Sequence, residues 1–182
     1  DKLERYPQYN IYKIDAGLKG YKKDGIYDFP NFDKLEDYEA RCPSMKSFFK
    51  NLTGETLVMV SGADPIAAAS LKITSTIAEK AKVSLLYCQP EFTFLDKKYR
   101  LLDRMVFNVF QEYARSGAVE RLYIISYEVL REALGDVPIK DFENKLFEQA
   151  ATAYHMISVL QNDKYVYGNT LPPSDIAKIS TI

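Results

Sequence analysis

The sequence predicts an α/β domain in which helices flank a parallel sheet on both faces. Short apolar runs alternate along the chain with longer segments in which apolar residues recur every three or four positions. This alternation of strand and helix is typical of parallel sheets whose strands are joined by helical crossovers. The 182 residues, 47% of them hydrophobic, suit one domain with a substantial core.

The predicted strands are short runs rich in apolar, β-branched or aromatic residues. Thr56–Val60 and Val83–Cys88 are nearly continuous apolar runs, which is typical of strands buried on both faces of a parallel sheet. Asn10–Ile14 and Leu122–Ile125 are the other two predicted strands. Residues 18–42 are polar and contain Gly, Pro and Asp throughout, so we expect a long surface loop there.

The predicted helices follow from apolar periodicity and from the residues at their ends. They span Pro43–Leu52, Ile66–Lys80, Asp96–Arg115, Tyr127–Leu134 and Asp141–Leu160, and a last helix begins at Ser174-Asp175 and continues to the end of the chain. Asp64 suits the N-cap of the second helix, and Pro65 its first turn. The longest helix carries one apolar stripe, which consists of Phe142, Leu146, Ala150, Ala153, Ile157 and Leu160.

Charge and cysteine content argue against several classes of function. The 24 basic and 25 acidic residues nearly cancel, which leaves no electrostatic footprint for nucleic acid or for an anionic membrane. No apolar stretch approaches the roughly 20 residues that span a bilayer. Cys42 and Cys88 are expected to be free thiols in a reducing compartment, which indicates the cytoplasm. With His155 as the single histidine, we expect no metal site.

The carboxyl ends of the predicted strands are the expected ligand site, as in other open parallel sheets. Residues 61–65 (Ser-Gly-Ala-Asp-Pro) join a strand to a helix, where nucleotide-binding folds place a phosphate loop. Asp64 would bring a negative charge to a phosphate, and Pro65 lacks an N–H donor. Two interpretations therefore stay open, a modified phosphate site and an ordinary capped helix start. Asp15 is either a ligand-contacting carboxylate or a turn cap.

Several segments resemble, in order and spacing, the GTP-binding domain of the tubulin/FtsZ superfamily. They are Ile14-Asp15-Ala16, Arg41-Cys42-Pro43-Ser44, Thr56–Val60, Val83–Cys88 with Gln89-Pro90, Leu122–Leu130 and Asp141–Leu160. The resemblance implies a tubulin/FtsZ-like domain over residues 1–162, with Asp141–Leu160 as its long central helix. Residues 163–182 would then be a loop and the start of a following helix. It also implies a first strand and a glycine-rich loop upstream of Asp1.

The same resemblance implies roles for individual residues. It places Gly62, Ala63 and Asp64 at the phosphates of GTP or GDP. Asp15 lies at a strand end, where a carboxylate meets a ribose or a metal-bound water. Asn144 falls where the family reads guanine with an amide, although a polar residue on the outer face of a helix is the alternative interpretation. Asp175 is the one catalytic candidate, since acidic residues of that loop reach the nucleotide of the next subunit, but a helix N-cap also accounts for it.

The function implied is assembly. Residues 61–65 hold one glycine where the family has a run of glycines and threonines, so we expect GTP binding and hydrolysis to be weakened or lost. The protein would act as a homo-oligomer or within a larger protein assembly, in the cytoplasm or in a viral particle, without nucleic-acid or membrane partners. Two other functions stay open: a non-catalytic structural module of a larger assembly, which includes a viral one, and an unrelated α/β nucleotide-binding enzyme.

Overall fold

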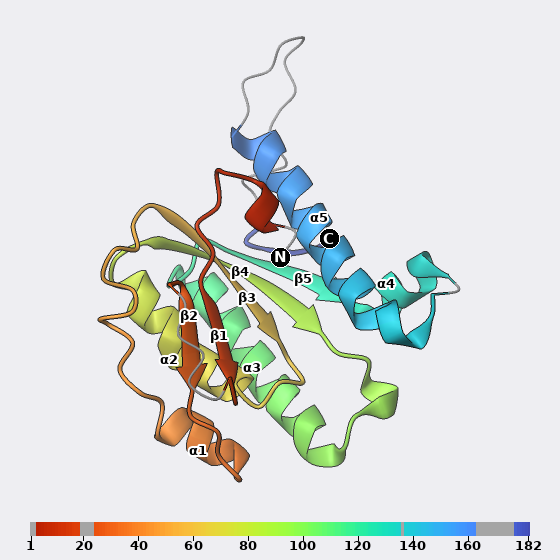
Figure 1. Ribbon diagram of the computed structural model, residues 1–182, viewed down its shortest axis with the longest axis horizontal. Coiled ribbons are helices and arrows are strands. Elements are labelled where there is room, and N and C mark those ends of the chain that lie inside the picture. The colour runs from red at the N-terminus through yellow and green to blue at the C-terminus, as the bar shows by residue number, and fades with distance from the viewer. Residues whose placement is uncertain (1–2, 19–23, 136, 163–176) are drawn as a thin grey trace.

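The computed structural model describes residues 3–18, 24–135, 137–162 and 177–182 (Figure 1). Strands and helices alternate along the described chain, which confirms the predicted α/β class. The elements in chain order are η1 (Leu3–Arg5), β1 (Lys13–Ala16), β2 (Ile26–Phe29), α1 (Leu35–Ala40), β3 (Glu55–Ser61), α2 (Ala67–Ala78), β4 (Lys82–Gln89), η2 (Phe92–Phe94), α3 (Lys97–Ser116), β5 (Arg121–Ser126), α4 (Tyr127–Leu134), α5 (Ile139–Asn162) and β6 (Ile179–Thr181).

The strands of the described chain form two parallel sheets. The larger sheet has the order β3-β4-β5-β6, and β1 pairs with β2 in a separate two-stranded sheet. In the larger sheet the register pairs Val60 with Tyr87 and Tyr87 with Ile124. The predicted parallel sheet is therefore confirmed for β3, β4 and β5, whereas β1, which was expected in the same sheet, lies in the separate one. The chain also contains, in its described part, no helix that is both long and apolar enough to cross a membrane.

Alternate residues of the central strand β4 belong to two different hydrophobic clusters. Tyr87 packs in the larger cluster with Ile73 of α2 and Phe110 of α3. Its neighbour Leu86 packs in the smaller cluster with Ala150 of α5. Successive side chains of a strand point to opposite faces, so β4 contributes to both clusters at once.

The helices that follow β3, β4 and β5 were predicted correctly, with ends that differ by a few residues. Gly117 ends α3 in the left-handed conformation (φ 79°), which glycine adopts without strain. The side chain of Ser126 caps α4 by accepting a hydrogen bond from the N–H of Val129 (3.4 Å). In α5 the predicted stripe is buried at Leu146 and Ala150, whereas Leu160 at its far end is 51% exposed.

The long loop predicted for residues 18–42 is wrong where the structure describes it. Ile26–Phe29 form β2, which pairs in parallel with β1, and Leu35–Ala40 form α1. Aromatic residues explain the order of this polar segment. Phe29 and Tyr38 are buried, and their rings stack with centroids 6.0 Å apart. Burial of such rings outweighs the turn-forming composition around them.

Two predicted helices are also wrong. Residues 43–52 form successive turns instead of a helix, and the N–H of Phe49 donates to the carbonyl of Met45 (3.0 Å) while both side chains are buried. At the end of the chain, Ile179–Thr181 form β6 against β5, and the N–H of Ile182 donates to the carbonyl of Ile124 (3.0 Å). The β-branched residues of β6 favour a strand that pairs with the edge of β5.

Candidate functional site

The carboxyl ends of β1 and β3 bring two predicted site residues together. Asp15 is the third residue of β1, and Asp64 lies three residues after the end of β3. The two carboxylates are close enough for Asp15 to act electrostatically on Asp64. Each also accepts a hydrogen bond from nearby backbone: Asp15 from the N–H of Ala16 (2.8 Å) and Asp64 from the N–H of Ile66 (2.8 Å).

The pKa of Asp64 is raised above the ordinary value of an aspartate. The largest cause is partial burial of its carboxyl group, although the residue as a whole is exposed. The hydrogen bond from Ile66 lowers the pKa, and the like charge of Asp15 raises it further. This end of the sheet is therefore a place where added negative charge is unfavourable.

Four backbone N–H groups after β3 are already engaged within the chain. A phosphate loop needs several N–H groups that point freely at the anion. Here Gly62 donates to the carbonyl of Cys88 (3.1 Å), Asp64 to that of Ser61 (3.2 Å), Ile66 to the carboxylate of Asp64 (2.8 Å), and Ala67 to the carbonyl of Asp64 (2.9 Å). Pro65 has no N–H to offer. The junction therefore resembles a capped helix start, in which Asp64 accepts hydrogen bonds from the N–H groups of Ile66 and Ala67.

Gly62 is required by packing at this junction. A Cβ at this position would overlap both the hydroxyl group of Tyr87 and the carboxylate of Asp103. The backbone can therefore pass over these two side chains only if the residue is glycine. The single glycine of the junction has a structural explanation that needs no phosphate.

Tyr87 and Asp103 form a buried pair that the sequence analysis missed. Asp103 is 2% exposed, and the hydroxyl group of Tyr87 donates to its carboxylate (2.6 Å) and lies 3.2 Å from its carbonyl oxygen. Burial raises the pKa of Asp103, while the hydrogen bond from Tyr87 and the charge of Arg104 lower it. Burial, and then the bond to Asp103, raise the pKa of Tyr87. The available signal was an aspartate on the buried side of α3, between Leu102 and Val106.

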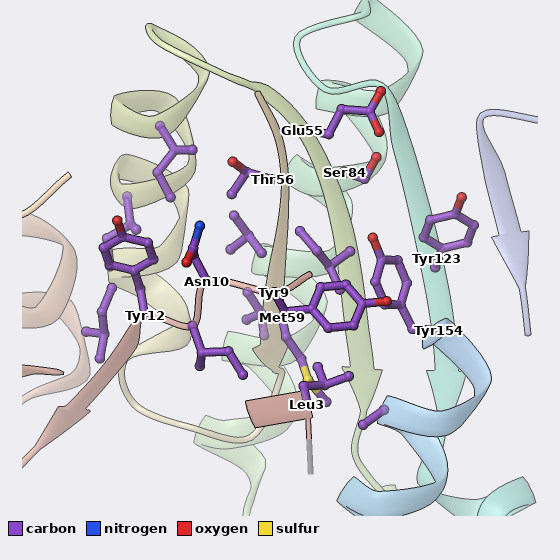
Figure 2. A pocket seen from close by; sticks show the side chains of 18 of the residues that line it. Leu3, Tyr9, Asn10, Tyr12, Glu55, Thr56, Met59, Ser84, Tyr123 and Tyr154 are labelled. Carbon is purple, nitrogen blue, oxygen red and sulfur yellow. The ribbon is translucent and has the colours of Figure 1, made fainter. Parts of the chain in front are cut away.

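A cavity of about 1360 Å³ opens beside β3 and reaches toward this junction. Figure 2 shows Thr56 and Met59 on β3 between Tyr12 on one side and Tyr154 of α5 on the other. Asp64 and Asn144 both line this cavity, so the structure brings Asn144 into the same region. Ala63 is half-buried between Gly62 and Asp64, and the predicted catalytic residue Asp175 lies outside the described residues.

The described chain contains no group of three or more His, Cys, Asp or Glu side chains that could hold a metal ion. Both cysteines are free, as predicted: Cys42 is half-buried and Cys88 is buried. Burial raises the pKa of Cys88 to about 11, so its thiol stays protonated near neutral pH. This site has neither a metal centre nor an activated thiol among the described residues.

Comparison with models of protein families, with curated proteins and with solved structures found no match. The function is therefore argued from the geometry of the chain itself. Three features carry that argument: the capped junction after β3, the neighbouring carboxylates of Asp15 and Asp64, and the cavity beside β3.

Proposed function

We propose that this chain is a divergent tubulin/FtsZ-like module that works by association with other protein subunits and does not depend on binding or hydrolysing GTP. One observation carries the proposal. Four N–H groups after β3 are bonded within the chain, and Asp15 and Asp64 bring two carboxylates close together at this junction. A nucleoside triphosphate, itself an anion, would gain few hydrogen bonds there and would meet like charge.

The arrangement of helices supports the tubulin/FtsZ-like layout. Tyr87 and Leu86 alternate along β4, and they pack against α2 and α3 in one cluster and against α5 in the other. This is the pattern expected when helices flank both faces of a sheet. The 24 residues of α5 suit a long central helix, and Figure 1 shows α5 running past the strands as the longest helix drawn.

Exposed apolar side chains on two separate helices support association. Leu101 and Met105 lie one turn apart on α3 and are 58% and 51% exposed. On α5, Met156 and Leu160 are 60% and 51% exposed at the same spacing. Contiguous exposed apolar groups are typical of protein interaction surfaces. Two such surfaces on different helices allow each subunit to contact two neighbours in a head-to-tail arrangement.

Sedimentation velocity over a range of protein concentrations tests the proposal. We expect species larger than a monomer to grow with concentration, equally without nucleotide, with GTP and with GDP. Lysine at both Leu101 and Met105 should shift the chain toward the monomer, because a charge in a buried interface is unfavourable. The matched control is Ser116→Lys, which adds the same charge at an exposed position of the same helix, eleven residues beyond Met105.

The outcomes of that experiment test association and its dependence on nucleotide separately. A monomer at every concentration would contradict association. Assembly that requires GTP would contradict the loss of nucleotide dependence and would favour an active member of the superfamily. A further run with ATP tests the alternative, because assembly that only ATP promotes would favour an unrelated α/β nucleotide-binding protein.

A further inference from the structure

The exposed face at the start of α3 combines basic side chains with apolar ones. Leu101 and Met105 lie one turn apart and are 58% and 51% exposed. Three exposed basic residues lie three or four positions from Leu101, and residues at that spacing share one face of a helix. This face is called the basic surface of α3, and it consists of Lys97, Lys98, Leu101, Arg104 and Met105.

The exposed face of α4 carries the opposite charge around an apolar residue. Val129 is 61% exposed, and Glu128 and Glu132 are exposed as well. Glu132 lies three positions after Val129 and four after Glu128, so the three side chains share one face. Arg131 is the single basic residue of α4, and it pairs with Glu91 (3.2 Å). Glu128, Val129 and Glu132 therefore form the acidic surface of α4.

Both surfaces lie at the same end of the larger sheet. Because β4 and β5 are parallel, the segments that follow them leave from one edge of the sheet. α4 follows β5 directly, and α3 follows β4 after η2. The ion pair between Glu91, just before η2, and Arg131 of α4 joins the two connections. In Figure 1 the arrows of β4 and β5 point toward the side on which α4 is drawn.

A second copy of the chain is the partner that fits both surfaces. If two copies meet at this end about a twofold axis, the basic surface of each lies on the acidic surface of the other. Val129 of one copy then packs against Leu101 and Met105 of the other, inside a rim of opposite charges. An anionic membrane or an acidic polymer would attract the basic surface but repel the acidic one beside it.

We propose that two copies of this chain pair face to face about a twofold axis, with the basic surface of α3 in each copy on the acidic surface of α4 in the other. This inference rests on the proposed association and specifies one contact within it. Met156 and Leu160 remain outside this contact, because Met156 lies about 25 Å along α5 from the end that adjoins α4. They are left for a second neighbour.

Charge reversal followed by sedimentation velocity tests the proposal. Lys97→Glu with Lys98→Glu makes the basic surface acidic, and Glu128→Lys with Glu132→Lys makes the acidic surface basic. In either variant alone like charges face each other, so we expect the dissociation constant of the dimer to rise at least ten-fold. An equal mixture of the two variants should restore the dimer, because each surface of one variant then meets opposite charge on the other.

Two controls isolate this contact. All proteins carry Met156→Lys and Leu160→Lys, which removes the exposed apolar surface of α5, and we expect this background to form dimers and nothing larger. Lys50→Glu with Lys80→Glu makes the same change in net charge at exposed positions outside both surfaces. It should leave the dissociation constant within about two-fold of the background. Circular dichroism of each variant shows that it is folded.

Several outcomes overturn the pairing while the proposed association stands. They are a dimer that neither reversal weakens, a mixture of folded variants that stays monomeric, and a background that is monomeric or grows beyond the dimer although the natural chain associates. A natural chain that is monomeric at every concentration would overturn both proposals. Salt gives a measure that needs no charge reversal, because screening should weaken the dimer of the background, and a dimer insensitive to salt would contradict the pairing.

Discussion

The hydroxyl group of Tyr87 lies 2.6 Å from the carboxylate of Asp103, and this buried contact ties β4 to α3 directly beside Gly62. The junction after β3 is therefore held by the core beneath it. Its shape is set by packing, which explains why glycine is needed at this position without any role in binding phosphate.

Replacing Gly62 with alanine should destabilise the fold. The new Cβ would overlap the Tyr87 hydroxyl and the Asp103 carboxylate, and overpacking of this kind costs about 1–3 kcal/mol. Urea denaturation of the purified variant measures the loss. The cost should shrink in a Tyr87→Phe background, because the overlapped hydroxyl is gone. Equal stability of Gly62→Ala and the natural chain would show that the junction is not packed as described.

The Asp103→Asn substitution should change how stability depends on pH. Burial raises the pKa of Asp103 in the folded state above the unfolded value of about 3.9. As pH rises from below that value, the unfolded chain ionises first, so the natural protein loses stability until the folded pKa is passed. The asparagine variant lacks this loss and should gain relative stability over the same window.

Urea titrations at several pH values between 3.5 and about 7 test whether Asp103→Asn gains stability relative to the natural chain as pH rises. The control is Asp96→Asn, which removes an exposed carboxylate at the start of the same helix. A difference between Asp103→Asn and the natural chain that does not vary with pH would contradict an elevated pKa at Asp103.

Removing the charge of Asp15 should lower the pKa of Asp64. Burial is the main cause of the raised value and stays in place, but the like charge of Asp15 adds to it. Carboxyl ¹³C chemical shifts, followed by NMR through a pH titration of Asp15→Asn, measure the change. Asp28→Asn removes the neighbouring carboxylate that is in register with Asp15, and it should have the smaller effect. An unchanged pKa of Asp64 in the Asp15→Asn variant would mean that the two carboxylates are not close.

Thr74→Val should stabilise the protein. The hydroxyl group of Thr74 is buried in α2 and has no hydrogen-bond partner within the part of the chain that the structure describes. Relief of an unsatisfied buried hydroxyl by an isosteric methyl group is worth about 1 kcal/mol. Thr76 is the matched control, because its hydroxyl donates to the carbonyl of Lys72 (2.9 Å). Thermal denaturation should show a higher midpoint for Thr74→Val alone.

Elements with a strong periodic pattern could be predicted from the sequence. The apolar runs of β3 and β4 and the buried positions Leu146 and Ala150 of α5 follow directly from residue type and spacing. In contrast, β2 lies in a polar segment, where two buried aromatic rings decide the structure, and β6 depends on a partner strand far away in the sequence. Such strands depend on tertiary contacts that a local pattern does not contain.

The candidate site, too, could be predicted from the sequence only in part. Asp15 and Asp64 could be expected near the carboxyl ends of strands, but their proximity could not, because β1 and β3 lie in separate sheets. The role of Gly62 could not be predicted, since it depends on the contact between Tyr87 and Asp103 beneath it. An aspartate within a helix is usually a solvated side chain, and only its position on the buried side distinguishes Asp103.

Isothermal titration calorimetry with GTP and Mg²⁺ tests the central claim most directly. The engaged N–H groups after β3 and the carboxylates of Asp15 and Asp64 predict that this chain shows no saturable binding up to millimolar GTP. Saturable binding at micromolar GTP, weakened further by Gly62→Ala, would contradict the account and would restore the junction after β3 as a working phosphate loop.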